Sequence, residues 1–248
     1  MFDFSGRTAL VTGSASGIGL AIATALSENG ADLILLDRNG DGLETAATGI
    51  SQSTNREVRR FEVDVIQRAD LEHVHNSLGD TQPDILVNAA GFNCRKPIDE
   101  ISESEFISVL NVHLLACFNS TQLFTRGMVS RGKGAIVNIA SIAAHRTLIP
   151  NVSPYVAGKA GIMQFTRATA VEYAAKGIRA NSISPGFIDT PLTQQHSDEV
   201  RDALTAAVPM RRFGLPVEIA GAALFLLSDY ASYVNGADLV CDGGCLAL

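Results

Sequence analysis

The sequence lacks several features that mark other classes of protein. Its 248 residues contain no run approaching the roughly 18–20 consecutive apolar residues of a membrane span. The start, MFDFSGR, has no basic segment followed by an apolar stretch, so no secretory signal is expected. The formal net charge of −7 argues against a nucleic acid partner. Repeats, low-complexity stretches and linkers are absent, so one domain over residues 1–248 is expected.

Cysteine and metal-ligand patterns are equally sparse. The four cysteines form no Cys-x-x-Cys pair. Nothing therefore indicates a secreted disulfide framework, and reduced thiols in a cytoplasmic protein are the simplest interpretation. No group of His, Cys, Asp and Glu residues has the spacing of metal ligands, so we expect no metal site.

What the chain does contain is an informative pair, Tyr155 and Lys159, with Ser141 upstream. Residues four apart lie on one face of a helix, which holds an ammonium beside a phenol. A phenol titrates near ~10, and a neighbouring positive charge lowers that pKa, so the tyrosine can exchange a proton with an alcohol oxygen near neutral pH. Any amphipathic helix can also carry a tyrosine and a snorkelling lysine. The chemical interpretation therefore needs a cofactor site elsewhere.

A candidate cofactor site lies near the N-terminus. The stretch RTALVT predicts a short strand, the glycine-rich turn GSASGIG follows at residues 13–19, and a helix-prone segment comes next. Strand, glycine turn and helix is the arrangement that binds phosphate groups. We assign Gly13 to the tight turn, Gly17 to the approach of a pyrophosphate, and Gly19 to the packing of helix on strand. The spacing differs from Gly-x-Gly-x-x-Gly, and a plain glycine turn is the alternative.

Asp37 bears on which dinucleotide would bind. It ends the second predicted strand, about 20 residues past the glycines, where a carboxylate can bond both ribose hydroxyls of an adenosine. The same charge would repel the extra phosphate of NADP. Ser16 stands where a Lys or Arg would help to hold that phosphate, whereas Arg38 could pair with it or lie over the adenine. We expect NAD rather than NADP; a strand-end aspartate without a ligand is the alternative.

Apolar strands and helical segments alternate along the chain. The predicted strands are Thr8–Val11, Asp32–Leu36, Val58–Val63, Ile85–Asn88, Gly134–Ile139, Arg179–Ile183 and Asp238–Val240. The predicted helices are Ile18–Asn29, Gly40–Ser51, Ala69–Leu78, Glu103–Arg131, Pro154–Lys176 and Val217–Leu227. This alternation predicts a doubly wound, mostly parallel seven-stranded α/β sheet with helices on both faces.

Five candidate residues each follow a predicted strand: Asp37, Asp64, Asn88, Ser141 and Pro185. The carboxyl ends of parallel strands meet at one edge of a sheet, and ligands bind beyond that edge. These residues are therefore expected to converge on one cleft.

Together the motifs resemble the short-chain dehydrogenase/reductase family in its single-domain branch. They are, in order, TGSASGIG, Asp64-Val65, Asn88-Ala89-Ala90-Gly91, Asn111, Ser141, Tyr155-x-x-x-Lys159 and Pro185-Gly186. Each motif is modest alone, but their joint order and spacing are specific. The resemblance spans residues 6–244 and implies a Rossmann-type fold.

The resemblance implies roles for individual residues. Tyr155 would be the catalytic acid/base, and Lys159 would lower its pKa and hold the nicotinamide ribose. Ser141 would position the substrate oxygen, and Asn111 would support a proton-relay water. The cofactor would contact Gly13, Ser16, Gly17, Ile18, Gly19, Asp37, Asp64, Val65, Asn88, Ala89, Gly91, Pro185, Gly186, Ile188 and Thr190, besides Tyr155 and Lys159. Asn88 would also tie neighbouring strands together.

The substrate site is expected under a lid at about residues 187–214. Gln194, Gln195 and His196 lie in this segment, which has few large apolar residues. That composition favours a small polar substrate such as a polyol, sugar or hydroxy acid. The candidate substrate contacts are Asn93, His145 and Phe187. Of the polar residues that follow the Asn-Ala-Ala-Gly turn, only Asn93 is expected to be close enough.

Two departures from the family pattern stand near the reactive tyrosine. Gly158 precedes Lys159 where relatives often have serine, which weakens the helix slightly. Ser141 lies one residue farther before Tyr155 than in many relatives, so the loop between them is expected to carry an inserted residue. Neither departure removes a chemical group.

The resemblance further implies a homotetramer with two-fold axes. Small residues on more than one face of Pro154–Lys176 permit it to pair with its own copy. The tail Cys245-Leu246-Ala247-Leu248 fits the prenylation form Cys-a-a-X, but no basic cluster precedes it. We expect the tail to pack at a subunit interface instead.

The resulting prediction is an NAD-dependent oxidoreductase that interconverts a secondary alcohol and a ketone. A 3-oxoacyl thioester reductase using NADPH shares every motif, and Asp37 counts against it. A non-catalytic dinucleotide sensor of the same fold is the alternative of another class. The intact set of Ser141, Asn111, Tyr155 and Lys159 argues against that sensor.

Overall fold

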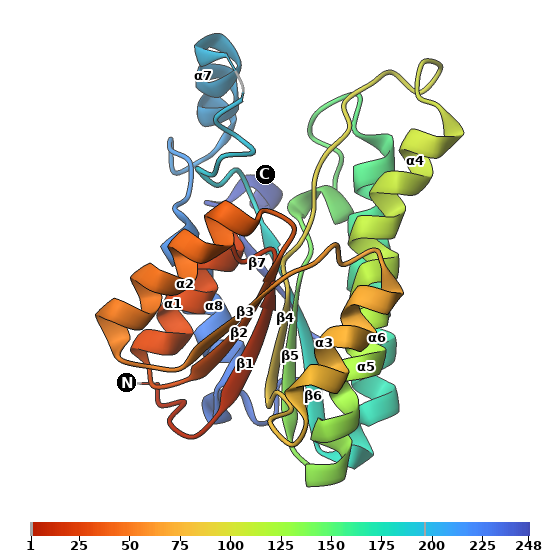
Figure 1. The fold of residues 1–248 in the computed structure, drawn as a ribbon. Coiled ribbons are helices and arrows are strands. Elements are labelled where there is room, and N and C mark those ends of the chain that lie inside the picture. The colour runs from red at the N-terminus through yellow and green to blue at the C-terminus, as the bar shows by residue number, and fades with distance from the viewer. Residues whose placement is uncertain (1, 196) are drawn as a thin grey trace.

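The computed structural model describes residues 2–195 and 197–248. Seven strands form one sheet in the order β3-β2-β1-β4-β5-β6-β7 (Figure 1). The strands are β1 (Thr8–Thr12), β2 (Asp32–Asp37), β3 (Val58–Glu62), β4 (Ile85–Asn88), β5 (Gly134–Ile139), β6 (Ile178–Pro185) and β7 (Asp238–Cys241). Every pairing is parallel. The predicted strands are confirmed, each within two residues of the observed bounds.

Helices cover both faces of this sheet (Figure 1). On one face lie α1 (Gly17–Glu28), α2 (Gly40–Thr54) and α8 (Pro216–Leu227); on the other lie α3 (Arg68–Leu78), α5 (Ala116–Arg131) and α6 (Ser153–Tyr173). Along β1, Val11 packs toward the first set and Leu10 toward the second. Burial on both faces explains why the strands are continuous apolar runs. The predicted doubly wound α/β domain is confirmed.

The predicted helix Glu103–Arg131 is interrupted. It consists of α4 (Glu103–Leu110), a π-helical turn (Asn111–Leu115) and α5, and Ser102 caps its start in a capping box with Glu105. In the π turn the Ala116 N–H donates to the Asn111 carbonyl, five residues back. Single π turns inside α-helices often mark functional sites. Here the turn contains Asn111 and His113, which become important below.

The same stretch is the one helix in the described chain that is long and apolar enough to cross a membrane. That test uses length and composition alone, and a core helix also passes it. Within this protein, 44% of the apolar window is buried. Leu123, Phe124 and Met128 pack into the core beside β4 and β5.

One helix, α7 (Asp198–Ala207), was not predicted. None of its side chains is buried, although Val200, Ala203, Leu204 and Ala207 recur at helical spacing along one face. Figure 1 shows α7 beyond the carboxyl edge of the sheet, away from the layers that form the core. It belongs to the segment expected to form the substrate lid.

Candidate active site

A cavity of about 310 Å³ lies beyond the carboxyl edge of the sheet. The glycine loop lines one side through Gly13, Ser16, Gly17, Ile18 and Gly19. The ends of β2, β3 and β4 contribute Asp37, Asp64, Val65, Ala89 and Gly91. The opposite side is formed by Ser141, Tyr155, Lys159, Pro185, Gly186, Ile188 and Thr190. The structure thus brings most of the predicted cofactor residues to one cavity.

A different structural constraint favours glycine at each of these positions in the loop. Gly13 has φ +67, and a Cβ there would lie 2.7 Å from the Ala90 Cα. A Cβ on Gly19 would lie 2.1 Å from the Gly13 carbonyl oxygen, so this glycine closes the loop on itself. Gly17 has φ +56 and begins α1, which directs free backbone N–H groups into the cavity. An N-terminal helix end of this kind suits a pyrophosphate.

Asp37 links β2 to the glycine loop. Its Oδ2 accepts a hydrogen bond of 3.0 Å from the Ala15 N–H, and its Oδ1 accepts one of 2.9 Å from the Asn39 N–H. A carboxylate has about four acceptor sites, so each oxygen retains one for a ribose hydroxyl. Arg38 lines the same cavity. The cavity is therefore lined both by Asp37, which we expect to exclude a 2′-phosphate, and by Arg38, which could bind one.

Asn88 lies within the sheet rather than on the cavity wall. Its Nδ2 donates to the Asn138 Oδ1 at 2.8 Å, and its Oδ1 accepts from the Ser120 hydroxyl at 2.8 Å. The Asn138 Nδ2 in turn donates to the Thr166 hydroxyl at 2.9 Å. The expected tie between neighbouring strands is therefore present. Asn88 is not among the residues that line the first cavity, and its expected cofactor contact stays a prediction.

Lys159 is buried, with 5% of its surface exposed. Its Nζ donates to the Ile139 carbonyl at 2.7 Å and lies 5.6 Å from the centroid of the Tyr155 ring. Burial lowers the pKa of Lys159 to about 8. The spacing of the two residues on α6 therefore does place ammonium and phenol together, as the sequence predicts.

The electrostatic consequence differs from the expectation. Burial raises the pKa of Tyr155; a hydrogen bond with Ser141 and the charge of Arg95 oppose that rise. The charge of Lys159 does not oppose this rise in the pKa of Tyr155, since the ammonium is turned toward the Ile139 carbonyl. The predicted lowering of the Tyr155 pKa by Lys159 is therefore not found. Tyr155 is half-buried, and its desolvation outweighs the favourable Ser141 hydrogen bond and Arg95 charge.

His113, in the π turn, packs edge-on against Tyr155, with ring centroids 5.3 Å apart. Its Nε2 lies 2.7 Å from the Phe92 carbonyl, which can only accept, so Nε2 carries the proton. Burial and the charge of Lys159 lower the pKa of His113 to about 3. The imidazole is thus neutral at physiological pH.

Two glycines make room for this imidazole. A Cβ on Gly91 would lie 2.4 Å from the His113 Cε1, and a Cβ on Gly158 would lie 3.2 Å from the His113 Cβ. The departure at Gly158 therefore has a local cause: a larger residue would crowd the histidine that supports Tyr155. Asn111 begins the turn that sets His113 in place, and its own side chain is not among the residues lining the cavity.

A second cavity, of about 320 Å³, adjoins the first and shares Ser141, Tyr155 and Gly186 with it. Asn93 and Phe187 line it as predicted, and so does Gln195. His196 lies outside the described residues. Arg95 also lines this cavity, which corrects the expectation that only Asn93 is close enough. Its position depends on the fold of the segment after β4, and no local sequence pattern indicates it.

His145 does not line this cavity. Its Nε2 lies 2.7 Å from Asp238 Oδ2 and 3.4 Å from the Ser184 hydroxyl. His145 therefore faces Asp238 at the start of β7, and its predicted contact with a substrate stays a prediction. The loop that follows it contributes Leu148, Ile149 and Val152 instead, which makes this wall more apolar than the lid composition suggested.

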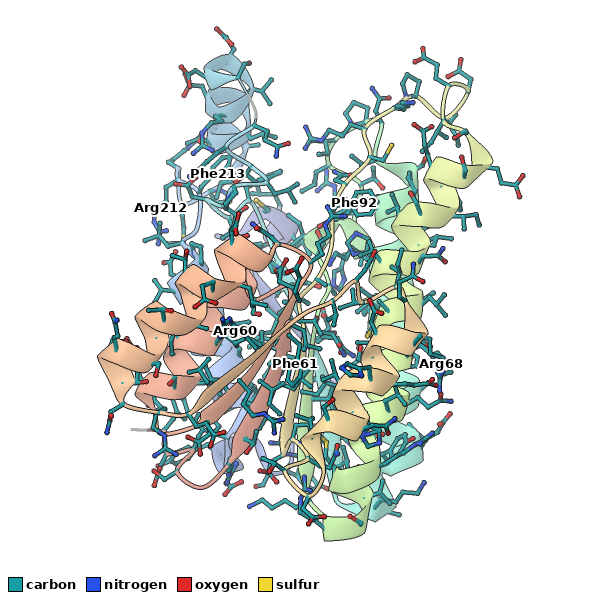
Figure 2. All side chains as sticks on the ribbon, in the orientation of Figure 1. Arg60, Phe61, Arg68, Phe92, Arg212 and Phe213 are labelled. Carbon is teal, nitrogen blue, oxygen red and sulfur yellow. The ribbon has the colours of Figure 1, made fainter. Side chains whose placement is uncertain are left out.

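The segment 187–214 leaves and rejoins the domain at one point. Ile188 and Gly214 form a parallel bridge, in which the Asp189 N–H donates to the Gly214 carbonyl at 2.8 Å and the Gly214 N–H donates to the Phe187 carbonyl at 2.9 Å. Figure 2 shows Phe213 below α7 and Phe92 at the same end of the sheet, toward the α4 side. Between Ile188 and Gly214, Thr190 lines the first cavity and Leu192 lines both cavities.

A parallel sheet of this order, with a glycine loop at its carboxyl edge and a tyrosine, serine and lysine beside it, defines a dinucleotide-binding oxidoreductase. A family model described as "Enoyl-(Acyl carrier protein) reductase" matches residues 13–245. The chain belongs to the short-chain dehydrogenase/reductase family, as its motifs predicted.

Individual relatives cover almost the whole chain. The 3-oxoacyl-[acyl-carrier-protein] reductase of Chlamydia trachomatis is 40% identical over 96% of this chain and 96% of its own length. The D-threitol dehydrogenase of Mycolicibacterium smegmatis is 40% identical over 98% of this chain and 95% of its own. The crystal structure of a gluconate 5-dehydrogenase from Burkholderia cenocepacia, in complex with NADP and tartrate, has TM-score 0.93 and 33% identity, covering 100% of this chain and 98% of the other.

The contact between His113 and Gly158 can be tested by a double-mutant cycle. Gly158→Ala alone should lower kcat/KM about tenfold, because crowding His113 displaces the Tyr155 ring, and small misplacements of reacting groups are costly. In the His113→Gly background, which also removes the His113 Cβ, the same change should instead stabilise the protein by up to about 1 kcal/mol, as alanine does in a helix. Urea denaturation and steady-state kinetics measure both.

Gly49→Ala on α2 is the matched control, since a Cβ there would meet nothing within 4 Å. It should give the helix stabilisation without any change in kcat/KM. Strictly additive free energies in the His113 and Gly158 cycle would contradict the proposed contact, since coupled neighbours usually differ from additivity by about 0.5 kcal/mol or more.

Proposed function

We propose that this oxidoreductase uses NAD to interconvert a secondary alcohol and a ketone, with a small polar substrate such as a polyol, sugar or hydroxy acid. One observation carries the proposal: Ser141 and Tyr155 are shared by the two cavities. A cofactor in the first cavity and a substrate in the second would therefore meet at these hydroxyls. Such a junction fits hydride transfer coupled to proton transfer.

In the oxidation direction, the Ser141 hydroxyl would hold the substrate oxygen and Tyr155 would accept the alcohol proton. Lys159, beside both Tyr155 and the cofactor cavity, would hold the ribose. The nicotinamide supplies the hydride acceptor when bound. His113 would keep the phenol ring in position without exchanging protons, since its imidazole stays neutral.

A second candidate is 3-oxoacyl thioester reduction with NADPH. The apolar wall of Leu148, Ile149 and Val152 favours it, since an acyl chain could lie there. The relative from Chlamydia trachomatis has that activity in its name. The relatives named for D-threitol and gluconate favour a small hydroxylated substrate instead. We prefer the latter because Asn93 and Gln195 present polar groups to the same cavity.

The cofactor choice rests on Asp37. Its two oxygens are fixed by the Ala15 and Asn39 N–H groups in positions suited to a ribose diol, and its charge opposes a 2′-phosphate. The gluconate 5-dehydrogenase of Burkholderia cenocepacia contains NADP in its crystal structure. Arg38, which lines the same cavity, is the residue through which this chain could do likewise.

We also propose a homotetramer built on the outer faces of α5 and α6. Phe118 on α5 is 39% exposed and Val171 on α6 is 81% exposed. Phe118 meets Phe165 of α6 edge-to-face, with centroids 6.1 Å apart, so the two helices present one continuous apolar surface. Burying this surface against a second copy would remove it from water. The tail, whose Leu248 is 80% exposed, would pack against a neighbouring subunit.

Tyr155→Phe tests the chemistry. It removes the proton-transfer group alone, so turnover should fall by about 10²–10⁴-fold while NADH binding stays within a few-fold. In the wild type, oxidation needs the deprotonated phenol, whose pKa is raised, so the oxidation rate should increase as pH rises. Reduction needs the protonated phenol and should show the opposite trend. Substantial turnover by the variant would mean that another group is the acid/base.

Cofactor choice is tested by kcat/KM with NAD and NADP. The wild type should prefer NAD, and Asp37→Asn, which removes the charge but retains an acceptor oxygen, should shift the ratio toward NADP by about tenfold or more, since like charges in contact cost several kcal/mol. Arg38→Ala is the comparison: it should weaken NADP use selectively. A wild type that prefers NADP would refute the role given to Asp37.

Assembly is tested by light scattering at micromolar concentration. The wild type should have the mass of a tetramer, and Phe118→Glu should reduce it, because a charge would be buried at the interface. Gln52→Glu, at an exposed position of α2 on the other face of the sheet, adds the same charge away from α5 and α6 and is the control. A monomeric wild type with full activity would exclude the tetramer.

A further inference from the structure

The second cavity is lined by one positive charge that the chemistry proposed above does not use. Among the described residues that line it, Arg95 is the charged one; the other polar groups, such as Asn93 and Gln195, are neutral. The protein as a whole is acidic, with net charge −7. The negative field of the rest of the molecule repels anions. A cation at this cavity would offset that repulsion locally for an anionic ligand.

Arg95 combines access to solvent with a place on the wall of this cavity. It is an exposed residue, and the partial desolvation that lowers its pKa leaves it protonated, as arginine is in proteins. Its charge reaches Tyr155, whose phenolate it favours. Guanidinium donors match a carboxylate in two parallel hydrogen bonds, so Arg95 suits an anionic group of a ligand.

A neighbouring polar atom points to a second contact. The Asn93 Oδ1 is buried and has no hydrogen-bond partner within the described protein. Asn93 lines the same cavity as Arg95 and stands two residues before it. A buried acceptor without a partner costs free energy, which a ligand hydroxyl would recover. The cavity thus offers a donor fork for an anion and an acceptor for a hydroxyl, beside the reactive Ser141 and Tyr155.

We infer that the substrate is a small hydroxy acid, with its carboxylate on Arg95 and a non-reacting hydroxyl on Asn93. The inference rests on the proposed alcohol–ketone chemistry and narrows it, since a neutral polyol would leave Arg95 without a ligand charge. The carbon chain would run past Phe187 and Leu192, which line the same cavity. Arg95 also adjoins the phenol, so the carboxylate and the reacting oxygen would be close neighbours.

The experiment compares matched aldonates and alditols, D-threonate with D-threitol and D-gluconate with D-glucitol, in wild type, Arg95→Gln and Arg95→Lys. Removing the charge should lower kcat/KM for the aldonates by about 10- to 100-fold, mostly through KM, and change the alditols less than about threefold, since a charged hydrogen bond contributes about 1.5–3 kcal/mol. Arg95→Lys should restore part of the aldonate activity. The gain in Tm on adding an aldonate to protein with NAD should vanish in Arg95→Gln.

Lys96→Gln is the matched control. Lys96 is the adjacent cation, but its Nζ is paired with Glu105 at 2.5 Å and it does not line the cavity. This variant should leave both substrate classes unchanged. A pH–rate profile with an alditol separates the remaining possibility: if Arg95 acts only on Tyr155, Arg95→Gln should move that profile and slow alditols as much as aldonates, which would overturn the inference.

Other outcomes are equally decisive. Turnover of alditols without aldonates, or reduction of acetoacetyl-CoA without either, would overturn the hydroxy acid while leaving the oxidoreductase proposal intact. No NAD- or NADP-linked turnover of any of these compounds, with a Tyr155→Phe variant indistinguishable from wild type, would instead refute the proposed function itself.

Discussion

The active site depends on a chain of buried polar side chains that crosses the middle of the domain. Ser120, Asn88, Asn138 and Thr166 are joined by hydrogen bonds of 2.8–2.9 Å and connect α5, β4, β5 and α6. Leaving one such group unpaired in the interior costs about 1–3 kcal/mol, so the four elements have one favourable alignment. That alignment sets β5, which ends before Ser141, against α6, which carries Tyr155 and Lys159. The positions of the reactive hydroxyls follow from it.

The sequence predicted what local patterns determine and missed what tertiary contacts determine. Strand bounds follow from short apolar runs, and the convergence of Asp37, Asp64 and Ser141 follows from parallel topology, so these were predictable. The direction of a side chain after a strand is not a local property. His145 contacts Asp238 and Arg95 lines the second cavity, although each simply follows a strand and a short turn in the sequence.

The pKa values of Tyr155 and Lys159 on α6 likewise depend on tertiary contacts that their spacing in the sequence does not reveal. A four-residue spacing establishes that Tyr155 and Lys159 are neighbours, but it says nothing about how much water surrounds them. Burial raises the pKa of Tyr155 and lowers the pKa of Lys159 to about 8, so desolvation disfavours the charged form of each group. Desolvation thus competes with the attraction between the two charges. The protein contains a reactive pair whose charged forms are costly, as functional sites commonly do.

The bridge between Ile188 and Gly214 has an evolutionary consequence. The described part of the segment between them pairs with no strand of the sheet, and its other contacts, such as the Met210 N–H to the Gly243 carbonyl, lie beyond the sheet, so its length, helix content and polarity can change without disturbing the register of any strand. A Cβ on Gly214 would lie 2.7 Å from the Ile188 Cδ1, at the movable end of that side chain. Substrate range can therefore diverge by replacement of one exchangeable insert while the proton-transfer apparatus is inherited intact. For protein engineering, the same two residues mark the boundaries at which an insert from a relative should be joined.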